Sequence, residues 1–176
     1  AVVGCGTAPT TAGFTHDGRR VRVALPALAP SGRMVPANPA PVPAPAIDTL
    51  CVTVTYEGEP ADGLIISTDT AGRWRAFGDN WPDRGRHWLA TVDHPSDKAV
   101  VNVTATVPAG LEAVAGGRLV ERTDAADRST FRWEAAEPMS PYLASLTVGD
   151  MQLSEKDGPA GIRILDGVPA RRPELL

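Results

Sequence analysis

The chain has 176 residues, which is enough for one domain with a substantial core, and a second domain is not expected at this length. Apolar residues make up 43% and charged residues 22%, a composition that excludes a largely disordered protein. The net charge of -4 and the lack of a clustered Lys/Arg stripe argue against a nucleic-acid partner. No run of about 18 apolar residues occurs, so we expect no transmembrane segment.

The first 13 residues are small and polar, and we expect residues 1–13 to form a disordered tail. The stretch "AVVGC" is similar to the end of a bacterial lipoprotein signal, in which a small residue precedes the lipidated cysteine. It is equally well explained as a short apolar tail. The two cysteines, Cys5 and Cys51, permit one disulfide or none and are too few for a zinc site. We therefore expect an exported bacterial protein of the cell envelope or exterior, with Cys5 as the candidate lipid acceptor.

Two features follow this tail. Val21, Val23 and Leu25 alternate with polar residues after an Asp-Gly turn, and this pattern predicts a half-buried strand. Residues 36–46 contain five prolines and no charge. Because proline cannot donate the hydrogen bonds of a β-ladder, we expect this segment to be an extended, polyproline-like connector over the surface.

Alternation with a period of two returns after the connector and continues to the end of the chain. Such segments lie at 48–58, 62–67, 98–110, 128–153 and 161–165. The segment 111–124, "LEAVAGGRLVERTD", predicts two strands joined by a Gly-Gly turn as a hairpin. No segment longer than a turn or two has helical periodicity. Strands at roughly 8–12-residue spacing with Gly and Pro between them indicate an all-β protein, an antiparallel sandwich or a barrel.

The segment 77–99, "FGDNWPDRGRHWLATVDHPSDKA", concentrates tryptophan, histidine and charged residues. His87 and His94 lie seven residues apart with Asp93 and Asp97 nearby, but the spacing is not that of a helical His pair, and we favour hydrogen-bonding roles over a metal site. The chain contains no Gly-x-Ser-x-Gly elbow and no phosphate-binding Gly-rich loop. We therefore do not expect the chain alone to be catalytic.

Three tryptophans recur at intervals of seven, at Trp74, Trp81 and Trp88. Exposed on a sandwich, such rings would stack on sugars. Tryptophan is, however, usually at least partly buried, so a structural role is the stronger interpretation.

Four segments occur in an order known from one enzyme family: "VTYEGEPADGL", "FGDNWPDRGRHWLATVDHPSDKA", "VPAGLEAVAGGRLVE" and "FRWEAAEPMSPYLASLTVGD". Together they resemble the N-terminal domain of the M1-family zinc metallopeptidases, the relatives of aminopeptidase N and leukotriene A4 hydrolase. The resemblance covers about residues 14–165. Arg86, Asp93, Pro95 and Lys98 match the family pattern in the second segment, and "PMSPYLASLTVGD" is similar to the strand near the end of that domain.

The resemblance implies a curved antiparallel β-sandwich over 14–165 and a C-terminal linker over 166–176. It further implies that this domain packs against a catalytic domain in cis and closes one side of the active-site cleft. The family binds zinc through a His-Glu-x-x-His segment and a further Glu of the catalytic domain, and this chain lacks that segment and the Gly-x-Met-Glu-Asn strand. We therefore expect no metal and no cofactor in this chain, and zinc in the catalytic domain.

In the family, the loop that corresponds to "GDNWPD" places Gln or Glu before the proline to hold the α-amine at the peptide N-terminus. Here Trp81 precedes Pro82 and cannot accept a hydrogen bond, and the nearby acceptors are Asp79 and Asn80. We predict that Asp79, Asn80 and Trp81 form the substrate-binding tip, through a carboxylate or amide acceptor or the π face of the indole. The remaining alternative is that anchoring of the amine is weakened in this chain. Family members carry further strands before "FTHDGRRVRVALP", so the first strands of the sandwich are expected to be missing.

Arg86, Asp93 and Pro95 are predicted to fix the shape of this loop, Arg86 through its planar, multi-donor guanidinium. Two alternatives stay open. One is a free-standing secreted sandwich that binds peptide or carbohydrate. The other is a hydrolase that uses His87, Asp93 and His94, which requires these side chains to converge in an open cleft.

Overall fold

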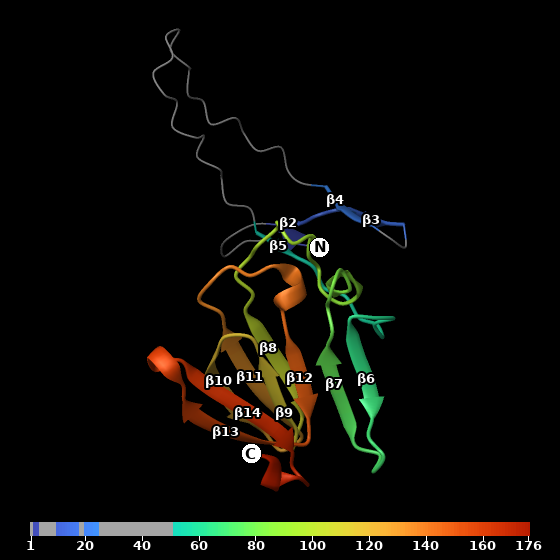
Figure 1. Ribbon diagram of the computed structural model, residues 1–176. Coiled ribbons are helices and arrows are strands. Elements are labelled where there is room, and N and C mark those ends of the chain that lie inside the picture. Colours follow the sequence, from blue (N-terminus) through green and yellow to red (C-terminus); the bar gives the residue numbers. More distant parts are fainter. Residues whose placement is uncertain (1, 4–9, 18–19, 25–50) are drawn as a thin grey trace, which may run out of the picture. The chain divides into compact units, whose positions relative to one another are not determined.

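The computed structural model describes residues 2–3, 10–17, 20–24 and 51–176 (Figure 1). The chain divides into two compact units, Ala1–Gly58 and Glu59–Leu176, and each is described by itself. Cys5 and the expected connector at 36–46 lie outside the described residues.

In the described residues of the unit Ala1–Gly58 there are five short strands. Three of them form an antiparallel sheet in the order β2-β1-β5, and the other two pair as the hairpin β3-β4. Their bounds are β1 (Val2–Val3), β2 (Thr10–Thr11), β3 (Phe14–His16), β4 (Val21–Val23) and β5 (Val52–Thr53). The hairpin includes the strand predicted from the alternation of valines, but Phe14 and Val21 are exposed. Strands β1 and β2 fall within 1–13, where the sequence indicated a disordered tail. Cys51 is disulfide-bonded.

The unit Glu59–Leu176 holds two antiparallel sheets and a long hairpin (Figure 1). The four-stranded sheet has the order β6-β7-β12-β9, the three-stranded sheet has the order β10-β11-β8, and β13 pairs with β14. The strands are β6 (Leu64–Thr68), β7 (Trp74–Gly78), β8 (Val103–Pro108), β9 (Glu112–Ala115), β10 (Arg118–Asp124), β11 (Arg128–Glu134), β12 (Leu146–Gly149), β13 (Met151–Asp157) and β14 (Arg163–Pro169). Three 3-10 turns lie between strands, η1 (Gly85–His87), η2 (Pro141–Leu143) and η3 (Pro159–Gly161), and a fourth, η4 (Pro173–Leu175), follows β14.

The predicted all-β sandwich is confirmed, since the described part of the chain contains strands and 3-10 turns but no α-helix. Strand β14 runs to Pro169, beyond the boundary at residue 165 that the sequence indicated, and η4 follows it. Among the described residues, no helix has the length and apolar character needed to cross a membrane.

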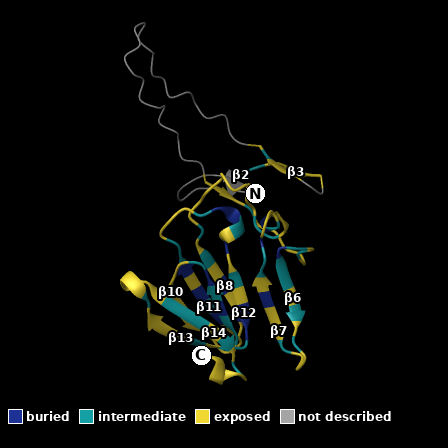
Figure 2. Cartoon of the chain, viewed as in Figure 1, coloured by how far each residue is buried: buried dark blue, intermediate teal, exposed yellow. Residues whose placement is uncertain are grey.

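The core lies between the two sheets. Buried residues alternate with more exposed ones along several of their strands (Figure 2). Strand β11 supplies the large rings of Phe131 and Trp133, and β9 supplies Ala113 and Ala115, which leave room for them. The Trp133 indole N–H donates a hydrogen bond of 3.0 Å to the Ala113 carbonyl oxygen. This bond satisfies the buried donor and ties one sheet to the other.

The predicted hairpin at 111–124 is wrong. Strands β9 and β10 both form, but β9 pairs with β12 and β10 pairs with β11, so the glycines between them carry the chain from one sheet to the other. Gly117 has a φ of 98°, and a Cβ there would lie 2.2 Å from the Glu134 carbonyl oxygen. Two requirements therefore select glycine, the left-handed backbone and the close approach of β11.

Substitution of Gly117 separates these two requirements. We expect Gly117→Ala to lower the free energy of unfolding by about 3 to 4 kcal/mol, because the Glu134 carbonyl must move in addition to the left-handed strain. Gly110 is the matched control, since its φ is 86° and nothing lies within 4 Å of a Cβ built there. Gly110→Ala should cost only about 1 to 2 kcal/mol. Urea unfolding measures both, and equal losses would contradict the steric argument.

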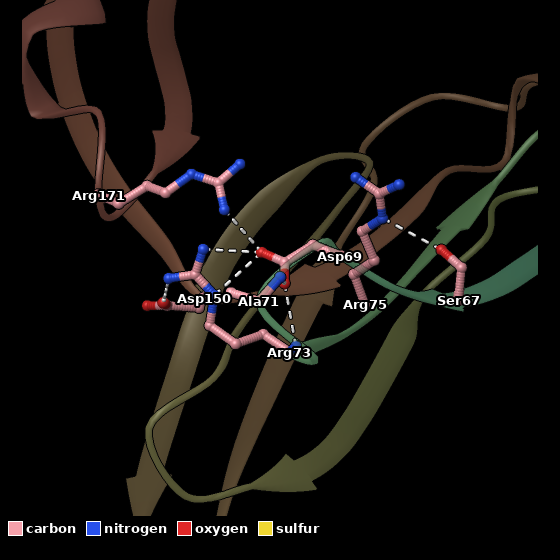
Figure 3. Close-up of polar contacts among 7 residues, drawn as sticks. All are labelled: Ser67, Asp69, Ala71, Arg73, Arg75, Asp150 and Arg171. Carbon is pink, nitrogen blue, oxygen red and sulfur yellow. Dashed lines mark hydrogen bonds and ion pairs between the residues drawn. The ribbon is translucent and has the colours of Figure 1, made fainter.

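An ionic cluster joins the turn between β6 and β7 to the open end of the β13-β14 hairpin, where β13 begins and β14 ends (Figure 3). Asp69 Oδ2 lies 2.7 Å from Arg73 Nη2 and 2.8 Å from Arg171 Nη1. Asp69 Oδ1 accepts hydrogen bonds from the N–H groups of Ala71 and Arg73. Arg73 Nη1 lies 2.7 Å from Asp150 Oδ2. The pKa of Asp69 is held well below its usual range, first by the Arg73 side chain and then by the backbone donors.

This lowered pKa gives Asp69 a pH-dependent effect on stability. Its contribution is fully present above the unfolded pKa of about 3.9 and declines as the pH falls below that value toward the folded pKa. We expect Asp69→Asn to lower the midpoint of urea unfolding by a constant amount between pH 7 and 5. The difference from the native chain should shrink below pH 4. Unfolding curves at matched pH values test this, and a difference that grows in acid would contradict it.

Candidate functional site

The predicted substrate-binding tip follows directly from the end of β7. The Asp79 N–H donates to the Gly63 carbonyl oxygen at 2.7 Å, and the Arg84 N–H donates to the Asn80 carbonyl oxygen at 2.9 Å. The chain therefore reverses over residues 80–84 before it enters η1, and the Trp81-Pro82 peptide within this turn is cis.

Asn80 lies inside this turn, although it was predicted to face a ligand. Its residue is 3% exposed. Its Nδ2 donates a hydrogen bond to the Ala144 carbonyl oxygen at 2.5 Å, and its Oδ1 accepts one from the Trp88 indole N–H at 2.8 Å. Both polar atoms of the amide are engaged, so in this structure Asn80 holds the turn and offers no group to solvent.

Trp81 is the exposed part of the tip. It is 62% exposed, and its ring meets the Tyr142 ring edge-on, with centroids 5.0 Å apart and an interplanar angle of 84°. Tyr142 belongs to η2, and Ala144, the partner of Asn80, follows η2 directly. Two independent contacts thus join the tip to the segment 140–144.

Asp79 and Arg84 form the charged side of the tip. Asp79 Oδ2 lies 2.6 Å from Arg84 Nη2, and Asp79 remains 41% exposed. The Arg84 Nε–H donates to the Trp81 carbonyl oxygen at 2.7 Å, and its Nη1 lies 3.5 Å from Asp62 Oδ1. One guanidinium therefore faces two carboxylates, which leaves a net negative charge beside the exposed indole.

The predicted loop-shaping residues Arg86, Asp93 and Pro95 lie in the segment after the tip. The Asp93 carboxylate is 3% exposed and accepts the Arg86 N–H at 2.9 Å and its Nε–H at 3.4 Å. Arg86 Nη2 also donates to the Asp93 carbonyl oxygen at 3.2 Å. The Pro95 carbonyl oxygen accepts the Ser140 hydroxyl at 2.7 Å. These contacts tie residues 86–95 together and connect them to the residues just before η2.

The histidines of this segment make local contacts. His94 is exposed, and its Nδ1 hydrogen bonds to the Ser96 hydroxyl at 2.7 Å. The Asp93 carboxylate binds Arg86, and among the described residues no hydrogen bond or ion pair joins it to the ring of His87 or His94. Within the ranges that the structure describes, no group of three His, Cys, Asp or Glu side chains comes together to hold a metal ion.

The three evenly spaced tryptophans do not form one exposed row. Trp74 begins β7, whereas Trp81 follows the other end of that strand. Trp88 is half-buried, and its indole N–H is bound to Asn80. This arrangement gives no support to a sugar-stacking surface built from all three rings.

Sequence reasoning missed Tyr142, Arg84 and Asp62, which complete the surroundings of the tip. Asp62 and Tyr142 lie far from the tip along the chain, so only the folded structure brings them to it. Arg84 lies inside the segment 77–99, five residues after Asp79, and this closeness to a carboxylate was the available signal.

The buried amide of Asn80 yields a direct test of how the tip is held. Asn80→Ala removes two hydrogen bonds and leaves the Ala144 carbonyl without this donor, so we expect a loss of about 2 to 4 kcal/mol in the free energy of unfolding. Asn102 is the matched control, because its Oδ1 accepts the Ala135 N–H at 3.1 Å in an exposed setting. Asn102→Ala should cost less than about 1 kcal/mol. Chemical denaturation measures the free energy of unfolding of both variants. An equally small loss in the two would contradict the role of the Asn80 amide in holding the tip.

No family model matches the sequence, and no curated protein matches it significantly. Solved structures do match. The M1 zinc metallopeptidase from Deinococcus radiodurans matches with a TM-score of 0.50 and 25% identity, over 62% of this chain and 26% of that chain. A mutant two-domain M1 zinc metallopeptidase bound to L-arginine matches with a TM-score of 0.62 and 22% identity, over 90% of this chain and 35% of that chain.

Both structures are M1 zinc metallopeptidases, but the two matches differ in coverage and in sequence identity. The second match covers nearly the whole chain and shows the shared fold, and the first adds the sequence likeness. This chain spans about a quarter to a third of the length of either structure. The resemblance predicted from the sequence is confirmed at this level: the chain contains an M1 peptidase-like β-domain.

Proposed function

We propose that this chain is the non-catalytic N-terminal β-domain of an M1-type zinc metalloaminopeptidase. In this proposal it packs on a catalytic domain in cis and walls the substrate cleft near the peptide α-amine. The observation that carries the proposal is the likeness, in fold and sequence, to the M1 zinc metallopeptidase from Deinococcus radiodurans. The two-domain architecture named for the second match supports a catalytic domain as the partner.

The chemistry of the tip supports a role beside an ammonium group. A desolvated ammonium needs acceptors or a π face, and the tip offers the half-exposed Asp79 carboxylate beside the exposed Trp81 indole. Asp79 Oδ2 is paired with Arg84, whereas Oδ1 has no side-chain partner among the described residues. In this proposal Asp79 and Trp81 contact the amine, and Asn80 acts as a positioning residue behind them.

The zinc and the reacting groups belong to the catalytic domain in this proposal. No side chain of the described part of this chain is assigned a catalytic role. Export of the protein is part of the proposal, and the disulfide at Cys51 supports it because disulfides persist mainly in oxidising compartments. Lipidation of Cys5 remains a prediction.

Binding of a peptide amine to the tip is the experiment that tests the site. We expect a tripeptide amide with a free N-terminus to shift the NMR signal of the Trp81 indole N–H with a Kd of about 1 mM or weaker. The N-acetylated tripeptide amide should cause no such shift, because it carries no ammonium. Asp79→Asn should weaken binding. Trp81→Ala should weaken it too, and because this variant lacks the indole reporter, its binding is followed through the backbone N–H signals of Asp79 and Asn80.

Asp83 provides the control within the same loop, since it is more exposed than Asp79 and pairs with Arg86 at 3.3 Å. Asp83→Asn should leave binding unchanged. Equal binding of the N-acetylated peptide would contradict a role of the tip in binding the amine. The reading frame is the companion test of the family assignment: a His-Glu-x-x-His segment downstream of Leu176 supports it, and a stop codon directly after Leu176 contradicts it.

A further inference from the structure

A hollow lies in the unit Glu59–Leu176, and its lining does not include the tip residues Asp79, Asn80 and Trp81. Its volume is about 400 Å³, and it is bordered by β7, β12, the start of β13 and the end of β14. This size falls within the range of small-molecule sites, roughly 300 to 1,000 Å³. The lining combines apolar side chains, among them Phe77, Met151 and Val168, with five charged ones. A lining of this kind suits a ligand with an apolar body and one charged group.

The charges around the hollow do not balance. Three guanidinium groups, of Arg73, Arg75 and Arg171, stand against the carboxylates of Asp69 and Asp150, which leaves one positive charge in excess. Arg73 is fully committed to the cluster of Figure 3, with Nε and Nη2 on Asp69 and Nη1 on Asp150. Arg73 and the two carboxylates therefore form a fixed frame.

The other two arginines retain unused donors. Arg171 uses only Nη1, which donates to Asp69 at 2.8 Å, and Arg75 uses only Nε, which donates to the Ser67 hydroxyl at 3.1 Å (Figure 3). Their remaining guanidinium nitrogens have no protein partner in the described part of the chain. Arg75 is also exposed. It lies two residues before Phe77 in β7, and side chains two residues apart in a strand lie on the same face of the sheet.

The excess of one charge selects the class of ligand. A monoanion neutralises this excess. A phosphate dianion would leave one negative charge in excess beside the Asp69 and Asp150 carboxylates, which repel it. A carboxylate is planar and accepts two parallel N–H bonds from a guanidinium fork. We propose that this hollow binds an organic monocarboxylate with an apolar group, such as the C-terminal residue of a peptide, with Arg75 and Arg171 on the carboxylate and Phe77, Met151 and Val168 around the apolar group.

This site goes beyond the proposed function, because it takes a carboxylate and lies away from the amine-facing tip. N-Acetyl-L-leucine is a suitable probe, since it has a carboxylate and an apolar side chain but no amine. Titrated into the full chain and followed by two-dimensional NMR, it should shift signals of β7, β12 and β14 and leave the Trp81 indole signal in place. N-Acetyl-L-leucinamide, which lacks the charge, should bind at least roughly tenfold more weakly.

Arg75→Gln keeps a polar side chain at an exposed position, so the variant should fold, and we expect it to weaken binding of the probe roughly tenfold. Arg128→Gln is the control, because Arg128 is an exposed arginine of the other sheet that pairs only with Asp127. It should leave binding unchanged. Three results would overturn the proposal: no shift with N-acetyl-L-leucine, equal binding of the amide, or tighter binding of inorganic phosphate. Failure here would leave the amine titration at the tip unaffected.

Discussion

The contact of two aromatic rings with a layer of alanines is the interaction on which the rest of the unit Glu59–Leu176 depends. Phe131 and Trp133 lie on one sheet, and the opposite sheet presents Ala76, Ala113 and Ala115. Larger side chains at those alanine positions would compete for the volume that the rings fill, since protein interiors are packed as densely as organic crystals. The indole N–H would be costly to bury alone, and its bond to the opposite sheet offsets that cost. The sandwich thereby fixes β12 and the residues that lead into it.

The tip depends on this core through the segment before β12. Ala144 and Tyr142 are held just ahead of β12, and they contact Asn80 and Trp81 in turn. The tip is therefore not an independent loop, and its geometry follows from the packing of a segment some 64 residues away in the chain. This explains how an exposed indole and a half-exposed carboxylate keep a defined relation on a turn with few buried apolar side chains.

Local pattern predicted many strands of this fold, but it missed β1, β2 and β7 and did not predict all of the strand partners. The alternation of apolar and polar residues over 62–67, 98–110 and 128–153 can be seen within each short segment, and the structure has strands in each of these ranges. The Gly-Gly pair before Arg118 was misassigned, because a turn into an adjacent strand and a crossing to the other sheet need the same local residues. The burial of Asn80 was equally unpredictable, since its partner Ala144 is chosen by tertiary packing. The family resemblance was available from the sequence, whereas the ligand-facing roles of Asp79 and Trp81 stay predictions.

Among the four tryptophans of the chain, Trp81, 62% exposed, and Trp133, 4% exposed, are natural optical reporters of opposite environments. A water-borne collisional quencher such as iodide reaches the first indole and is excluded from the second. Emission from the solvated ring lies at longer wavelength than emission from the ring packed between the sheets. Trp74 and Trp88 also emit, so events at the surface turn and loss of the interior become separate signals in a chain whose Trp74 and Trp88 are replaced by phenylalanine.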